Sequence, residues 1–208
     1  IKSISAGDFV QFEVPPRQNI ISPFLPERGL AEIYAKTGVG KTTFALSLAI
    51  AASTGKHFFE WEVRRPWKVL YIDGEMSTHE MQKRLTSAAE YFSEDPTKLS
   101  NLRLICRDRE NAGLPDIGSE KGQDWFSEDI EQAELVFLDN ISCLWWSGKE
   151  NDADAWSVIQ HWLLRLRAAG KSVVLLHHSG KNRSSRGSSR RHDVLDTVIK
   201  LERPFNYI

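Results

Sequence analysis

The chain has 208 residues, of which 41% are hydrophobic and 26% are charged, and its formal net charge at pH 7 is -1. This length suits one domain with a sizeable core and is marginal for two. The composition is that of an ordinary globular protein. Because the net charge is close to zero, the chain as a whole is not basic enough to bind nucleic acid by its overall charge. Any basic surface must therefore be local. Basic residues gather most densely between Lys181 and Arg191.

Two cysteines, Cys106 and Cys143, lie in or beside apolar segments and lack the spacing of metal ligands. We therefore expect a reducing, cytoplasmic environment without a disulfide between them. The longest apolar run, from Phe44 to Ala52, is too short to span a membrane. No signal peptide is visible, and we expect no membrane partner. The first residue is Ile, which leaves open that the chain is a fragment of a longer protein.

Residues 1–29 contain four prolines and are expected to form an irregular lead-in segment with one short strand, ahead of one domain over 30–208. Within that domain, apolar runs typical of strands alternate with segments of helical periodicity. The predicted strands cover 30–35, 68–73, 102–107, 134–140, 171–178 and 196–203. The predicted helices cover 41–53, 77–92, 118–131 and 154–169. This alternation predicts an α/β domain with a mostly parallel central sheet flanked by helices, which binds ligands beyond the carboxyl ends of its strands.

Local signals mark two of the predicted helix ends. Ser77 followed three residues later by Glu80 is a capping box at the start of the helix over 77–92. Gly170 is predicted to terminate the helix over 154–169.

The segment "AKTGVGKTT", from Ala35 to Thr43, fits the P-loop pattern G-x-x-x-x-G-K-[ST] except that Ala35 replaces the first glycine. A strand precedes it and a helix follows, which is the context that the motif requires and which disfavours a chance glycine-rich turn. Lys41 is expected to reach the β- and γ-phosphates of ATP, and the hydroxyl of Thr42 to ligate Mg²⁺. The expected nucleotide-binding residues are Thr37, Gly38, Val39, Gly40, Lys41, Thr42 and Thr43.

Two acidic residues lie at the carboxyl ends of separate strands. Asp139 ends the apolar run "LVFLD", and a carboxylate at the end of a buried strand is the Walker B arrangement that supports Mg²⁺. The alternative is a turn-forming aspartate. Asn140 follows it, so the residue that activates water must come from elsewhere. Glu75, in "YIDGEMS", is the candidate. Asp73 is the competing acid, and Glu75 could instead only favour the start of the next helix.

Two adjacent histidines end the strand over 171–178, and neighbouring strand residues point to opposite faces of a sheet. We expect His177 to be a structural residue of the core and His178 to face the site. The sequence "SGKNRSS" follows, in which Lys181 and Arg183 are either nucleic-acid contacts or part of a solvated loop.

Together these motifs resemble the RecA-like P-loop ATPase core. The closing segment "RGSSRRHDVLDTVIKLERP" resembles the last motif of hexameric replicative helicases, and "HHSGKN" and "PFLPERGLA" resemble RepA-type plasmid helicases. The resemblance covers residues 20–204, with Ala35 as a departure.

The resemblance implies that Glu75 activates water, Asp139 supports Mg²⁺ and His178 reads the γ-phosphate. It also implies that Arg186 is an arginine finger inserted into the site of the next subunit. ATP and Mg²⁺ are then the cofactors, and a homo-oligomeric ring, a hexamer, is the expected assembly.

In RecA-like motors a DNA-facing loop leaves the core where "CLWWSGKENDADAW" stands here. Lys149 in this segment, with Lys181 and Arg183, is a candidate contact to single-stranded DNA. Trp145 and Trp146 could stack on bases, but we favour packing under the following helix, because exposed paired tryptophans are costly.

The favoured function is an ATP-hydrolysing motor, a RepA-like DNA helicase that acts in replication of a plasmid, phage or other mobile element. The alternative is a non-motor RecA-like ATPase, such as a recombinase or a signalling switch, that self-assembles with ATP. A small-molecule kinase is disfavoured, because no separate arginine-rich lid is visible and Glu75 suits water activation.

Overall fold

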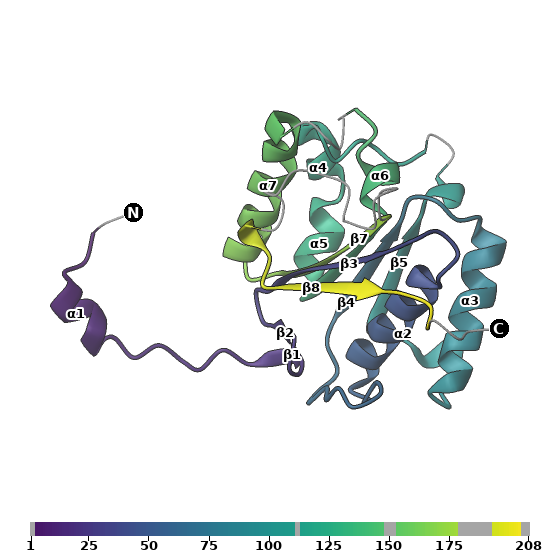
Figure 1. The fold of residues 1–208 in the computed structure, drawn as a ribbon, viewed down its shortest axis with the longest axis horizontal. Helices are drawn as coiled ribbons and strands as arrows, with labels where there is room; N and C mark the ends of the chain where they lie inside the picture. The colour runs from purple at the N-terminus through teal and green to yellow at the C-terminus, as the bar shows by residue number, and fades with distance from the viewer. Residues whose placement is uncertain (1–2, 111–112, 148–152, 179–192, 205–208) are drawn as a thin grey trace.

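The computed structural model describes residues 3–110, 113–147, 153–178 and 193–204. Its centre is a six-stranded sheet in the order β5-β4-β6-β7-β3-β8 (Figure 1), in which each neighbouring pair runs parallel. The strands are β3 (Leu30–Ala35), β4 (Val69–Asp73), β5 (Leu102–Cys106), β6 (Leu135–Asp139), β7 (Ser172–His178) and β8 (Thr197–Leu201). The predicted fold class is therefore confirmed: this is a RecA-like P-loop NTPase fold.

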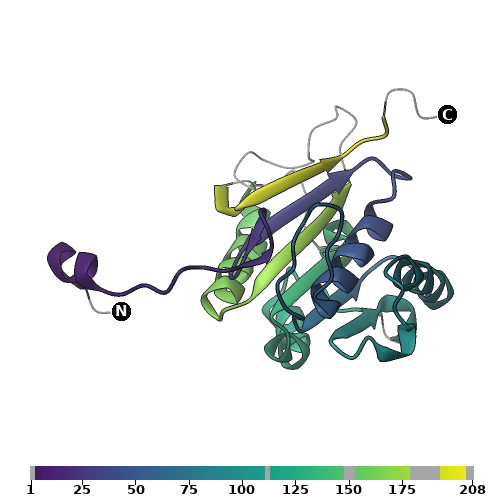
Figure 2. The same cartoon turned by 90° about the horizontal axis from the view of Figure 1, so that it is seen from below.

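Helices cover both faces of the sheet (Figures 1 and 2). The first face carries α2 (Lys41–Thr54) and α3 (Thr78–Tyr91), and the second carries α4 (Glu120–Trp125), α5 (Ser127–Gln132), α6 (Ile141–Leu144) and α7 (Ala153–Ala168). Every residue of β6 is buried, and its alternate side chains enter the two cores: Phe137 packs with α2, and Leu138 packs with α7. Burial on both faces explains the uninterrupted apolar runs of the sequence.

Both predicted helix ends are confirmed. The hydroxyl of Ser77 accepts a hydrogen bond from the backbone N–H of Glu80 and caps α3, which is the first of the two hydrogen bonds of the predicted capping box. Gly170 has a φ of 87° beyond the end of α7, and the next residue, Lys171, donates its backbone N–H to Leu166. This is the left-handed glycine that commonly ends a helix.

The predicted helix over 118–131 is wrong in one respect, because it is two short helices, α4 and α5. They meet at Phe126, which has a φ of -88° and a ψ of -4° and is fully buried. The break places Phe126 in the core while Trp125 stays 47% exposed. Burial of this aromatic ring outweighs the continuation of helical hydrogen bonding. The helix α6, four residues long, has no counterpart in the prediction.

The lead-in segment has more structure than the single strand expected. It contains α1 (Ala6–Gln11) and an antiparallel pair formed by β1 (Asn19–Ile21) and β2 (Leu25–Pro26). Ile20, Ile21 and Leu25 are buried in the core with α2. In contrast, residues 3–18 are all exposed, and α1 stands away from the sheet (Figure 1).

Both cysteines are free thiols, as expected. Across the described parts of the chain, no helix combines the length and the apolarity that crossing a bilayer requires.

Candidate functional site

A cavity of about 340 Å³ lies at the carboxyl ends of the central strands. The segment after β3, the end of β4, the helix α3 and the end of β7 all contribute to its wall. The lining residues are Lys36, Thr37, Gly38, Gly40, Lys41, Thr42, Thr43, Asp73, Glu75, Met76, Arg84 and His178. Six of the seven predicted nucleotide-binding residues are in this set; Val39 is not, and its N–H instead donates to the carbonyl of Lys36 at 3.3 Å.

The loop between β3 and α2 has a backbone that requires glycine at two positions. Gly38 has a φ of 81°, and Gly40, the N-cap of α2, has a φ of 102°. A Cβ atom at either position would meet nothing within 4 Å, so the positive φ and not crowding excludes other residues. The first N–H groups of α2 have no partner within the helix and point to its amino end, where the helix dipole favours an anion. The loop is therefore built to hold phosphate.

Beneath this loop, Asp139 is held by two buried partners. Lys41 Nζ lies 3.3 Å from Asp139 Oδ1, and the Tyr71 hydroxyl donates to Asp139 Oδ2 at 2.6 Å. Lys41 is only 5% exposed, Asp139 is 2% exposed and Tyr71 is fully buried. Burial, followed by the charge of Asp139, raises the pKa of Tyr71 well above its usual value. The phenol therefore remains a hydrogen-bond donor over the whole physiological range.

Asp73 lies next to Asp139 across the sheet, at the paired ends of β4 and β6. The pKa of Asp73 is raised to about 7: burial is the main cause and the charge of Asp139 adds to it, while the N–H of Met76, which donates to Asp73 at 2.9 Å, opposes the shift. The carboxyl of Asp73 is therefore partly protonated near neutral pH. The side chain of Glu75, two residues further along the chain, is 54% exposed.

The two other residues predicted to act on the γ-phosphate, Glu75 and His178, are brought together by Asn140. The amide nitrogen of Asn140 donates to Glu75 Oε2 and lies 3.2 Å from His178 Nε2, which itself lies 3.5 Å from Glu75 Oε2. Asn140 Oδ1 accepts the N–H of Cys143 and caps α6. This cap fixes which end of the amide faces the site. From the sequence, Asn140 was noted only because a glutamate at its position, next to Asp139, could have activated water.

Besides Lys36 of the loop, two further basic residues reach the site without having been predicted. Arg84 of α3 lines the cavity, and Arg203, beyond β8, donates to the carbonyl of Gly38 at 2.8 Å. Arg84 lies one turn beyond the buried Met81. Its position on the same face of the helix could therefore have indicated from the sequence that it points toward the sheet. Arg203 could not be found in this way, because its position depends on β8 pairing beside β3.

The tryptophans and His177 show which packing predictions hold. Trp145 is 3% exposed and its ring centroid lies 5.8 Å from that of Trp156, which confirms packing. Trp146, two residues beyond the end of α6, is 65% exposed, so the same prediction is wrong for it. His177 is fully buried, as expected. Lys149, Lys181, Arg183 and Arg186 lie outside the described residues.

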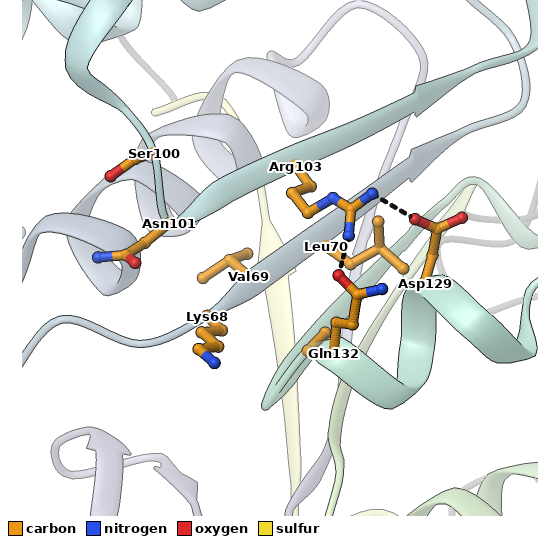
Figure 3. Close-up of a pocket in the computed structure, with 9 residues that line it drawn as sticks. Lys68, Val69, Leu70, Ser100, Asn101, Arg103, Asp129 and Gln132 are labelled. Atoms are coloured by element: carbon orange, nitrogen blue, oxygen red, sulfur yellow. Dashed lines mark hydrogen bonds and ion pairs between the residues drawn. The ribbon is translucent and has the colours of Figure 1, made fainter.

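Other cavities lie away from this edge of the sheet. One of about 250 Å³ is near the amino ends of β4 and β5 (Figure 3), where Arg103 pairs with Asp129 at 2.9 Å and contacts Gln132. Another, of about 580 Å³, lies between α5 and α7. Ligands of parallel sheets bind at the carboxyl ends of the strands. The position of the P-loop cavity therefore favours it over the larger one.

The residues present fit a magnesium ion that arrives with a nucleotide. No group of three or more His, Cys, Asp or Glu side chains in the described ranges could hold a metal by itself. Mg²⁺ is usually held through one or two protein ligands together with substrate phosphates. Thr42 in the cavity wall and Asp139 beneath it are the residues that would hold it.

A family model described as AAA domain matches residues 1–184. No curated protein matches the chain. Two similar solved structures are the RadB recombinase (19% identity, 73% of this chain and 62% of that chain, TM-score 0.48) and the flagellar accessory protein FlaH from Methanocaldococcus jannaschii (16% identity, 76% and 66%, TM-score 0.51). This chain covers less than two thirds of either protein, and at this identity the likeness to FlaH shows the fold alone.

Proposed function

The chain belongs to the family described as AAA domain, and from this membership we propose that it binds ATP with Mg²⁺ and hydrolyses the γ-phosphate. The observation that carries the proposal is one cavity that joins a phosphate-binding loop to the carboxylate of Glu75. A phosphate-binding loop alone would support binding only. Glu75 adds a partly exposed acceptor for the proton of an attacking water.

Within the site, the N–H groups of the loop and Lys41 bind the phosphates. As water attacks the γ-phosphorus, Glu75 takes its proton, and the bond to the β-phosphate oxygen breaks to leave ADP and phosphate. Asn140 holds Glu75 in place through its amide, and His178 lies close enough to both to respond to the γ-phosphate. Mg²⁺, when bound, neutralises charge on the phosphate oxygens. Arg84, in the cavity wall, offers a further positive charge for the phosphates.

The finer proposal is that residues 30–208 form the motor domain of a RepA-like DNA helicase that assembles as a ring, a hexamer. The resemblance of the segment from Arg186 to Pro204 supports it. Arg186 then acts as an arginine finger in the site of the neighbouring subunit. Lys149, Lys181 and Arg183 contact single-stranded DNA, and the exposed ring of Trp146 is available to stack on a base.

The alternative is a RecA-like ATPase that assembles with ATP but does not unwind DNA. The fold shared with FlaH, a flagellar accessory protein, is as compatible with this alternative as it is with a helicase. Both functions use the same ATP site and differ in the effect of DNA.

One experiment separates them: the ATPase rate with and without single-stranded DNA, together with the mass of the protein bound to a non-hydrolysable ATP analogue. A motor should assemble into a ring and hydrolyse ATP several-fold faster with DNA. Assembly without DNA stimulation favours the alternative. A protein that neither binds nor hydrolyses ATP in any of these conditions would contradict both.

A further inference from the structure

Tyr71 occupies the middle of β4, where an apolar side chain would satisfy packing equally well. Its ring stacks on that of Phe137, its partner in the sheet register, with centroids 5.5 Å apart and planes at 17°. Asp139 lies two residues beyond Phe137, so its side chain points to the same face of the sheet. The Tyr71 hydroxyl therefore reaches Asp139 Oδ2, at 2.6 Å, inside the core.

The two oxygens of Asp139 have different partners. Oδ2 faces the hydroxyl of Tyr71, and Oδ1 faces Lys41 of the phosphate-binding loop. A carboxylate can rotate about its terminal bond, and loss of one of two directional contacts would allow other orientations. The hydrogen bond from Tyr71 removes this freedom on the side away from the cavity. Its donor is fully buried, so water cannot replace it.

We propose that Tyr71 is a positioning residue, whose hydroxyl holds Oδ2 of Asp139 and thereby keeps Oδ1 directed at the phosphate-binding loop for the metal ion that accompanies ATP. This inference rests on the proposed function, because it assigns Asp139 to the metal. It goes beyond that function by assigning a task to a side chain that does not line the cavity. Lys41 can leave Oδ1 for the phosphates, whereas Tyr71 remains in place.

The direct test compares Tyr71→Phe, which keeps the ring and removes only the hydroxyl, with Tyr91→Phe, which removes a hydroxyl from an exposed position of α3. ADP affinity is measured by calorimetry with excess Mg²⁺ and with a chelator. In Tyr71→Phe, metal-free affinity should stay within about twofold of wild type, while the gain in affinity from Mg²⁺ falls about tenfold, as expected for one hydrogen bond to a charged group. Tyr91→Phe should match wild type in both.

Two results overturn the inference: an unchanged gain from Mg²⁺ in Tyr71→Phe, or equal losses of affinity with and without the metal, which indicate general damage to the site. The wild-type protein tests the proposed function separately. If its ADP affinity does not depend on Mg²⁺, the assignment of Asp139 fails, whatever the variant does.

If Tyr71→Phe does not fold, the intact chain answers the question through fluorine NMR of protein labelled with 3-fluorotyrosine. The chain has four tyrosines, and changing each of the other three to Phe assigns the resonance of Tyr71. Addition of Mg²⁺ to the ADP complex should shift this resonance and leave that of Tyr91 in place. A Tyr71 resonance that does not respond to Mg²⁺ overturns the inference.

Discussion

The amide nitrogen of Asn140 lies 3.2 Å from Nε2 of His178, and the same nitrogen donates to Glu75. One side chain thus connects the proposed base to the proposed phosphate sensor. Its oxygen is occupied by the N–H of Cys143 at the start of α6, so the amide cannot turn over without loss of the helix cap. Asn140 itself is fully buried.

Asn140→Ser should separate these two tasks. Serine caps helices about as well as asparagine, but its hydroxyl is too short to reach Glu75. We expect kcat for ATP hydrolysis to fall about tenfold or more, with little change in KM or in the midpoint of urea unfolding. Asn140→Ala is the control that also loses the cap, and it should cost about 1 kcal/mol of additional stability. Equal kcat values for the serine variant and wild type would show that the amide contact is incidental.

Glu75→Gln should keep ATP binding and reduce hydrolysis by about 100-fold or more, the usual contribution of a general base. Nucleotide affinity by calorimetry and single-turnover hydrolysis measure the two effects. The matched comparison is Asp73→Asn, at the competing acid two residues away. If Glu75→Gln still hydrolyses ATP and Asp73→Asn does not, the base is Asp73.

Lys41→Ala should abolish ATP turnover, because the loop loses its cation. It should also destabilise the fold by about 3 kcal/mol, since Asp139 would be left as an unpaired buried charge. Urea unfolding measures this second effect. The double variant Lys41→Ala with Asp139→Asn removes the unpaired charge and should recover part of the loss; a further loss would contradict the buried pairing.

Stability without Mg²⁺ should depend on pH through Asp73. Its pKa is raised to about 7 in the folded state from 3.8, so between these values the folded chain binds more protons than the unfolded chain. The contribution of this group is therefore fully present below about pH 4 and is lost as pH rises through 7. Asp73→Asn should remove this dependence and be the more stable protein at pH 8. A wild-type protein whose unfolding free energy shows no extra loss between pH 5 and 8, relative to Asp73→Asn, would contradict the raised pKa.

An arginine finger that acts between subunits predicts complementation. Arg186→Ala and Lys41→Ala proteins should each be inactive alone. Mixed, they should recover a fraction of wild-type turnover, at interfaces where an intact Arg186 faces an intact Lys41. Size measurement must show that the mixture assembles. An assembled mixture without activity would indicate that Arg186 acts within its own chain, or not at all.

Much of the fold was accessible from the sequence, because the signals concerned are local. The apolar run over 135–139 marks a strand buried on both faces, and Ser77 and Gly170 mark helix ends by their own hydrogen bonds and backbone angles. The break at Phe126 was not accessible, because it depends on which ring the core accepts. For the same reason, Trp145 and Trp146 could not be told apart: only the packing against Trp156 separates them.

By itself, the sequence determined the phosphate-binding loop, because a P-loop is a contiguous pattern whose glycines, lysine and threonine carry their chemistry wherever the segment lies. It also indicated that Glu75 and Asp139 lie at the carboxyl ends of strands of one sheet. Only the tertiary structure decided what surrounds them: Tyr71 beneath Asp139, Asn140 beside Glu75, and Arg203 at the loop. These contacts join residues far apart in the chain, and they follow from strand order, register and helix phase, which no short stretch of sequence specifies.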